Sequence, residues 1–282
     1  EGPFEVLCGH LSNNVPFYRD SDLSNNDLTK LPIFDLKMVR DNHSELVARP
    51  IPLQHGTYQY LTGRLDAERD YAITWTQFGV TVQNALIRKA LRWAEIDPAS
   101  EIIDVTTTIE RPDRSIDRLL PINKVITRLS EMTPRVIMLT ADVAGEFLRT
   151  LRENSQLKTK ILGILIDDCI LDLEARLSFT EQWSIPIVQV LTNPITGLYA
   201  IECPQTGVMH LSTETHIFEV LDEDGRKAGK GEVGELVVTG LYNLAEPITR
   251  FKTGRRGQIV SNDDLGPINR TGPIWTATDR QV

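Results

Sequence analysis

Acidic side chains and a histidine in the second half of this sequence have the chemistry of proton-transfer groups. Asp167 and Asp168 come directly after the apolar run "KILGILI", and Glu202 and His210 follow further along the chain. Carboxylates and imidazoles act as general acids and bases when they lie beside a reacting group. We therefore take all four as candidate catalytic residues. For the aspartate pair, the simpler alternative is a solvated turn in which one carboxylate caps the following helix.

The segments that must position these residues alternate between apolar runs and amphipathic stretches. Strands are predicted over residues 101–108, 135–140, 160–167 and 185–192, and helices over residues 121–132, 141–154 and 171–183. Nearly continuous apolar runs between amphipathic helices are typical of a parallel sheet covered on both faces. Ligands of such sheets bind at the carboxyl ends of the strands. The loops that begin at Thr106, Thr140, Asp167 and Thr192 are therefore candidate walls of a site.

The pattern differs on both sides of this alternating region. Before it come short helices and turns, broken by Pro16 and Pro32, and then a helix that ends before Pro98. After Thr192, the runs "GLYAIECP", "THIFEVLD" and "GELVVTG" read as strands of a smaller antiparallel subdomain. The expected fold is α/β, with a mixed or parallel sheet covered by helices in residues 1–192 and a β-rich subdomain in residues 193–275.

Composition narrows the class of partner. The chain has 282 residues and a formal charge of −9, and its longest basic cluster is the pair Arg255 and Arg256, so we expect no nucleic-acid partner. Its apolar runs are too short to span a bilayer, so we expect no membrane partner. The three cysteines are far apart and form no CxxC motif, which favours a reducing cytoplasm. The expected partner is therefore a small molecule or another protein, and a second copy of the chain is one such protein.

The stretch "HIFEVLDEDGRKAGKGEVGELVVTGLYNLAEPITRFKTG" resembles the adenylate-forming, AMP-binding ligases, and within them the phenylacetate-CoA ligase branch. Three further segments agree with that branch in the same order: "NNVPFYRD" with "LTKLPIFDLKMVRDN", "TADVAGEFLRTL" and "GLYAIECPQTGVMH". The resemblance implies the fold of the family's large N-terminal domain, with residues 276–282 as the remnant of a hinge and the small C-terminal domain absent. Enzymes of this family join a carboxylic acid to AMP and then to coenzyme A.

The positions that the family uses for ATP carry unsuitable residues in this chain. Residues 64–70, "RLDAERD", stand where the family has a phosphate loop of the "SGTTGxP" kind, and they include no glycine or hydroxyl. Ile195 stands at the glutamate that holds magnesium, and isoleucine offers no oxygen ligand. Arg255 stands at the aspartate that accepts from the ribose hydroxyls, and a guanidinium only donates. We therefore expect lost use of ATP and no cofactor.

The resemblance also implies where an acyl group would bind. In the family, the carboxylate substrate lies between the regions of the present Thr140–Ala144, the Asp167–Cys169 turn and the Thr192–Gly197 loop. We expect Thr140, Thr192, Asn193 and Gly197 to contact the substrate, together with Arg250 and Lys252 at the family's arginine positions. These two cations either bind an anionic substrate in place of phosphate or pair with Glu232 and Glu235 on neighbouring strands.

Cys203 and His210 follow the "EC…H" pattern of the family, some of whose members are expected to bind zinc there. Two ligands are too few for a zinc site with four protein ligands, so we expect no metal and regard these residues as weak zinc candidates. A buried, inert Cys203 is the simpler interpretation.

Taken together, these features predict an ATP-independent enzyme that acts on a carboxyl or acyl derivative in the cytoplasm. Hydrolysis, cyclisation and dehydration are the reactions that a general acid and base would support. We expect a role in specialised, natural-product metabolism, where duplicated ligases acquire new uses. Two alternatives remain open: a non-catalytic acyl-binding or regulatory partner of an active ligase, and an atypical ATP-dependent acyl-CoA or amide ligase.

Overall fold

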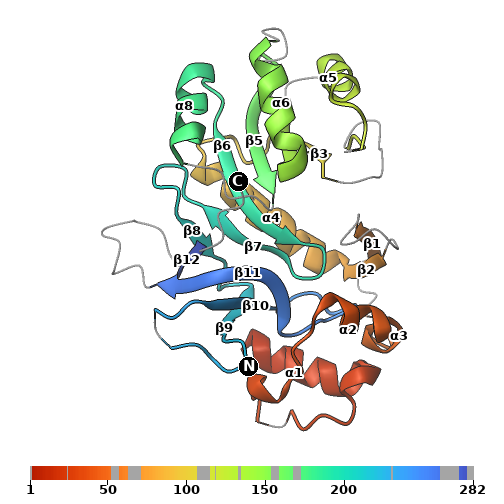
Figure 1. Cartoon of the computed structure of the whole chain (residues 1–282). Helices are drawn as coiled ribbons and strands as arrows, with labels where there is room; N and C mark the ends of the chain where they lie inside the picture. Colours follow the sequence, from red (N-terminus) through yellow and green to blue (C-terminus); the bar gives the residue numbers. More distant parts are fainter. Residues whose placement is uncertain are drawn as a thin grey trace. The chain divides into compact units, whose positions relative to one another are not determined.

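Figure 1 shows the computed structural model of the chain. The chain forms two compact units. The structure describes residues 2–23, 25–51, 57–62, 71–106, 115–117, 119–132, 135–153, 159–167, 173–229, 231–260 and 273–277. The first unit comprises residues 1–85, 193–199 and 210–279, and the second comprises residues 86–192, 200–209 and 280–282. The first 85 residues thus belong to the same unit as residues 210–279, and the division expected at residue 192 stays a prediction.

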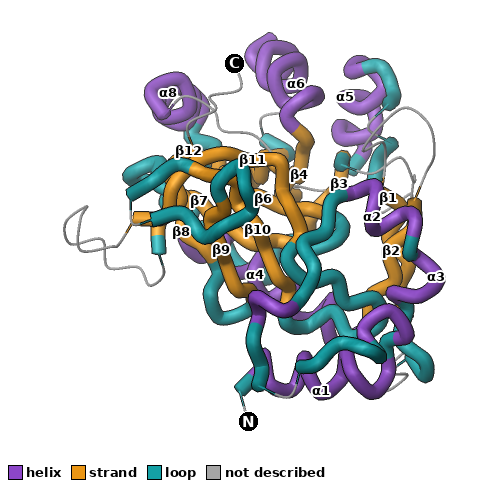
Figure 2. Tube along the Cα trace, turned by 60° about the horizontal axis from the view of Figure 1, so that its bottom comes forward, coloured by secondary structure: helices purple, strands orange, loops and turns teal. Residues whose placement is uncertain are grey.

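The second unit is built on parallel strands. They follow the order β3 (Ile102–Val105), β4 (Arg135–Thr140), β5 (Ile161–Asp167) and β6 (Ile187–Asn193). Helices α5 (Ile122–Glu131), α6 (Ala141–Glu153) and α8 (Leu173–Trp183) connect or follow these strands and lie side by side (Figure 2). This alternation confirms the α/β fold expected from the sequence.

One apolar core joins the three helices to the sheet. Phe147 of α6 and Phe179 of α8 pack in it with Ile164 of β5, and all three are 2% exposed or less. The opposite face of β5 is also covered, because Ile96 lies directly against Gly163. Because both faces are buried, the sequence of β5 is an almost continuous apolar run.

The first unit begins with helices α1 (Pro3–Asn14), α2 (Leu36–Asp41) and α3 (His43–Leu46) and the short 3-10 helices η1 (Pro16–Tyr18) and η2 (Leu28–Lys30). Pro3 starts α1, and Leu7 and Leu11, four residues apart, bury the same face. Asp35 caps α2 by accepting from the backbone N–H of Met38 at 2.7 Å. The sequence pattern did not indicate α1.

An antiparallel hairpin and an antiparallel sheet complete the first unit. In the hairpin, β1 (Thr57–Thr62) pairs with β2 (Tyr71–Thr76), and Thr57 lies opposite Thr76. The sheet follows the order β12 (Ile274–Ala277), β11 (Phe251–Val260), β10 (Gly234–Gly240) and β9 (His216–Leu221). Four of the described elements have residues in both units: β6, α4 (Gln77–Trp93), β7 (Gly197–Glu202) and β8 (Met209–Leu211). No described helix is long and apolar enough to cross a membrane.

We expect Gly234→Ala to destabilise the first unit by about 1–3 kcal/mol, because a Cβ atom at Gly234 would overlap the carbonyl oxygen of Leu221 on the paired strand. The midpoint of urea unfolding measures this loss. Gly9→Ala in α1 is the matched control, since nothing lies within 4 Å of its Cβ position. That change should raise stability by up to about 1 kcal/mol through helix propensity. Equal effects of the two changes would contradict the packing argument.

Candidate functional site

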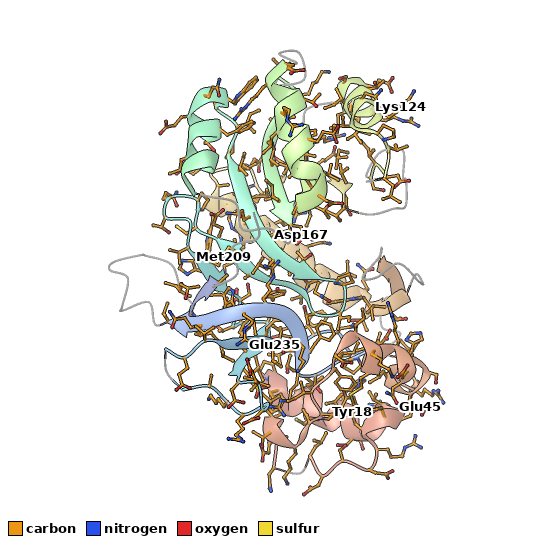
Figure 3. All side chains as sticks on the ribbon, in the orientation of Figure 1. Tyr18, Glu45, Lys124, Asp167, Met209 and Glu235 are labelled. Atoms are coloured by element: carbon orange, nitrogen blue, oxygen red, sulfur yellow. The ribbon has the colours of Figure 1, made fainter. Side chains whose placement is uncertain are left out.

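Polar side chains meet at the carboxyl ends of β4, β5 and β6 in the second unit. The parallel register places Thr140 beside Asp167. Asp167, which Figure 3 labels, accepts two hydrogen bonds from Thr192: one from its backbone N–H at 3.0 Å and one from its hydroxyl at 2.5 Å. Asp167 is only 8% exposed, so these bonds hold a nearly buried carboxylate in one orientation. The structure thus brings together three of the predicted site residues.

Thr140 gives this cluster an unsatisfied donor. Its hydroxyl oxygen is buried and has no hydrogen-bond partner among the residues that the structure describes. Leaving a buried hydroxyl without a partner costs about 1–3 kcal/mol. A ligand oxygen or nitrogen at the carboxyl ends of the strands would satisfy it. Asp168, the other aspartate of the predicted pair, lies outside the described residues.

The buried Glu202 side chain links two strands by hydrogen bonds. It is 0% exposed, and its carboxylate accepts from both the backbone N–H and the side-chain amide of Gln189, at 3.0 and 2.8 Å. These bonds connect β6 to β7. A general acid must reach its substrate, so this arrangement favours a structural role for Glu202 over the catalytic role expected from the sequence.

Cys203 and His210 are both 2% exposed. The Cys203 thiol donates to the side-chain oxygen of Gln205 at 3.3 Å, within a turn closed by the bond from the Gly207 N–H to the Cys203 carbonyl. Within the described ranges, no group of three or more histidine, cysteine and acidic residues is close enough to hold a metal ion. The weak zinc candidates therefore gain no third ligand from these residues.

Residues 193–197 of the predicted loop Thr192–Gly197 are held in place by other groups of the first unit. Trp75 donates its indole N–H to the Pro194 carbonyl at 3.0 Å. Gly197 has φ of +79°, and the side-chain amide of Gln83 occupies the space that a Cβ atom would need. The same amide oxygen accepts from the Leu198 N–H at 2.5 Å. The glycine is therefore required by both the backbone angle and this close approach.

A buried histidine holds the same loop. His216 donates from Nε2 to the carbonyl oxygen of Thr196 at 2.8 Å, and its Nδ1 lies 2.8 Å from the hydroxyl of Thr215. Burial, which disfavours the charged ring, lowers the pKa of His216 to about 4. At neutral pH the imidazole is therefore uncharged and carries its proton on Nε2. Sequence reasoning did not identify this residue.

Arg250 and Lys252, the predicted anion ligands, both make ion pairs. The buried Arg250 guanidinium donates to both carboxylate oxygens of Glu219 at 2.9 Å and to the carbonyl oxygens of Thr29 and Leu31 at 3.3 and 2.9 Å. Lys252 lies 3.3 Å from Glu235. These contacts favour the ion-pair alternative for both cations. For Arg250 the partner is Glu219, which is neither of the two expected glutamates, Glu232 and Glu235.

A histidine–glutamate pair in the first unit was also missed by the sequence analysis. The Glu246 carboxylate is 0% exposed and accepts from Nδ1 of His43 and from the backbone N–H of Thr74, both at 2.9 Å. His43 and Glu246 are 203 positions apart in the chain, so no local pattern could have indicated their contact.

The fold of this chain is similar to that of several solved acyl-CoA ligases. No protein-family model and no curated protein matches the sequence. Among solved structures, an open form of 2-hydroxyisobutyryl-CoA ligase in complex with 2-HIB-AMP and CoA is similar, with a TM-score of 0.76 and 13% identity, over 97% of this chain and 72% of that chain. Its postadenylation form gives a TM-score of 0.74 and 14% identity, over 97% and 65% of the two chains.

ATP-bound MatB from Rhodopseudomonas palustris is similar over 78% of this chain and 47% of that chain, with a TM-score of 0.50 and 11% identity. These likenesses confirm the expected fold of the adenylate-forming acyl-CoA ligases. At 11–14% identity they show the fold alone. The chain spans about two thirds to three quarters of the 2-hydroxyisobutyryl-CoA ligase chains and about half of MatB.

The buried His216 makes stability depend on pH. Its folded pKa of about 4 lies below the ordinary value of 6.5, so between these values the unfolded chain binds a proton that the folded chain does not. The contribution of neutral His216 to the free energy of unfolding is fully present above pH 6.5. As the pH falls towards 4, the free energy of unfolding decreases by about 3 kcal/mol. Urea unfolding of wild type and His216→Gln from pH 4 to 7 measures it. A constant difference between the two proteins over this range would contradict the prediction.

The unsatisfied hydroxyl of Thr140 predicts an unusual stability change. Thr140→Val removes a buried donor without a described partner, so we expect the free energy of unfolding to rise by about 1 kcal/mol. The matched control is Thr192→Val, which removes the hydroxyl bonded to Asp167 and should cost about 1–3 kcal/mol. Thermal or urea unfolding compares the two. A loss of stability in Thr140→Val equal to that of the control would show that its hydroxyl is already satisfied.

Proposed function

We propose that this protein binds a carboxyl or acyl compound at the carboxyl ends of β4, β5 and β6 and converts it without ATP, by hydrolysis or by cyclisation with loss of water. The observation that carries the proposal is the cluster of Thr140, Asp167 and Thr192. Asp167 is held rigidly by Thr192, and the buried Thr140 hydroxyl beside it lacks a partner among the described residues. An acyl oxygen that accepts from Thr140 would lie next to a carboxylate able to move a proton.

The residues at the family's ATP positions support the loss of nucleotide chemistry. Ile195, at the position of the magnesium-holding glutamate, is 2% exposed and packs in the apolar core of the first unit. No oxygen anion is available from that side chain for a hard cation. Arg255, at the position of the ribose-binding aspartate, lies in β11 and has no acceptor group. The acidic segment 64–70 lies outside the described residues.

The fold likeness favours a second candidate, an ATP-dependent acyl-CoA ligase with altered contacts. The similar 2-hydroxyisobutyryl-CoA ligase structure contains an acyl-adenylate and CoA, and the similar MatB structure contains ATP. This candidate requires other groups to take over magnesium and ribose binding.

We place the protein in the cytoplasm. Cys8 and Cys203 are free thiols and buried, which suits a reducing compartment. The substrate in either candidate is a small acyl or carboxyl compound, and a second copy of the chain remains a proposed partner.

Titration calorimetry with ATP and magnesium separates the two candidates, with an active acyl-CoA ligase as the positive control. We expect no heat from ATP, whereas a panel of acyl-CoA thioesters and free carboxylic acids should include a ligand that binds in the micromolar to millimolar range, about −8 to −4 kcal/mol. Asp167→Asn should weaken that ligand at least about tenfold, because it removes the carboxylate beside Thr140. Binding of ATP in the same range would favour the ligase and contradict lost nucleotide use.

A further inference from the structure

The two edges of the larger sheet are covered by other parts of the chain. Its edge strands are β3 and β9. Beside β3, the Ile116 N–H donates to the Asp104 carbonyl oxygen at 3.0 Å. Beside β9, the Ala228 N–H donates to the Val220 carbonyl oxygen at 2.8 Å. An edge that is left open offers its N–H and C=O groups to other chains, and these contacts prevent that at both ends of the sheet.

The hairpin of β1 and β2 has a covered edge along β2. The Thr74 N–H of β2 donates to the buried Glu246 carboxylate at 2.9 Å, so it points away from β1. Thr74 lies opposite Gln59 of β1. Residues that lie opposite each other in an antiparallel pair either exchange both backbone hydrogen bonds or exchange none. Gln59 therefore directs its N–H and C=O away from β2, and so do Thr57 and Leu61, two positions before and after it.

The outer edge of β1 is open within the part of the chain that the structure describes. Among the described strands, β1 pairs with β2 alone, and no other described segment forms a backbone hydrogen bond with Thr57, Gln59 or Leu61. The sequence of the strand, TYQYLT, contains no charged residue and no proline, the residues that usually protect an edge. It is rich in threonine and tyrosine, which favour strands. An edge of this kind is suited to pairing with a strand of another chain.

We propose that β1 forms the contact of a symmetric dimer, in which β1 of one copy pairs antiparallel with β1 of a second copy. A two-fold axis at Gln59 places Gln59 opposite Gln59, and Thr57 of each copy opposite Leu61 of the other. All three outward positions then exchange both backbone hydrogen bonds with the residues opposite them. The two hairpins join into one four-stranded sheet, which is more stable than a sheet of two strands.

The distribution of charge favours a second copy of the chain as the occupant of this edge. The chain has a formal charge of −9, so two copies repel each other over most of their surfaces. The strand β1 carries no charge, and its pairing with itself therefore places no like charges opposite each other. A strongly acidic or basic peptide would find no complementary charge on this strand.

This dimer goes beyond the function proposed above and does not depend on it. The strands β1 and β2 belong to the first unit, whereas Thr140, Asp167 and Thr192 belong to the second. The dimer is tested by the mass of the protein in solution, and the proposed function is tested by ligand binding. A failure of one is therefore distinguishable from a failure of the other.

Sedimentation velocity of the 282-residue chain at increasing concentration measures the association. A contact through one six-residue strand is small, so we expect a monomer–dimer equilibrium in the micromolar range. Gln59→Pro should weaken the dimer at least about tenfold, because proline has no N–H to donate across the two-fold axis. Gln59→Thr, the matched control, keeps the N–H and should dimerise like the wild type. The Gln59 N–H points away from β2, so circular dichroism should show that both variants retain the fold.

A pair of charge variants tests the symmetric register. Gln59→Lys and Gln59→Glu each place like charges opposite each other at the two-fold axis, so each variant alone should be mostly monomeric. Mixed in equal amounts, the two variants place a lysine opposite a glutamate and should recover the dimer. The proposal is overturned if the wild type stays monomeric at every concentration, if Gln59→Pro associates as strongly as Gln59→Thr, or if the mixed variants associate no more than either alone. A monomeric wild type whose β1 edge pairs with a strand of a different protein also overturns it.

Discussion

The first unit depends on keeping one buried charge satisfied. Arg250 is buried in this unit, and its backbone has a positive φ. Because water does not reach its guanidinium, protein groups must supply the acceptors. Glu219 on β9 supplies a carboxylate, and the Thr29 and Leu31 carbonyls supply the remainder. The backbone of Arg250 also accepts from the Phe34 N–H at 3.0 Å. A single side chain therefore fastens the N-terminal segment to the antiparallel sheet, and removing either partner would leave an unpaired buried charge.

The sequence was most informative where local pattern decides structure. The run over residues 135–140 became β4 with the same bounds, and the runs that became β5 and β6 differ from the prediction by one or two residues. Parallel strands end at one edge of a sheet, so the carboxyl-end rule was sufficient to place Thr140 and Asp167 side by side. Helix α1 was missed because its buried positions Leu7 and Leu11 alone do not form a clear periodic pattern.

Contacts between distant residues could not be predicted in the same way. Arg250 and Glu219 are 31 positions apart, and His43 and Glu246 are 203 positions apart. Their pairing is decided by how whole elements pack, and a lone glutamate in the sequence looks the same whether it is solvated or buried. The sequence left two alternatives for Arg250 and Lys252, an anionic substrate or pairing with Glu232 and Glu235. The observed partner of Arg250 is Glu219, because a motif records a residue type and not the acceptor that the surrounding chain provides.

The loop of residues 193–197 is ordered by contacts within the protein. In the family resemblance this loop carries a magnesium ligand, but here Ile195 packs in the core. The loop keeps a defined backbone because Trp75 and His216 donate to its carbonyl oxygens and Gln83 accepts from the N–H that follows it. All three bonds come from the protein itself, so the loop does not need a metal or nucleotide to order it. Under the proposed function, this independence allows acyl binding to be retained while nucleotide chemistry is lost.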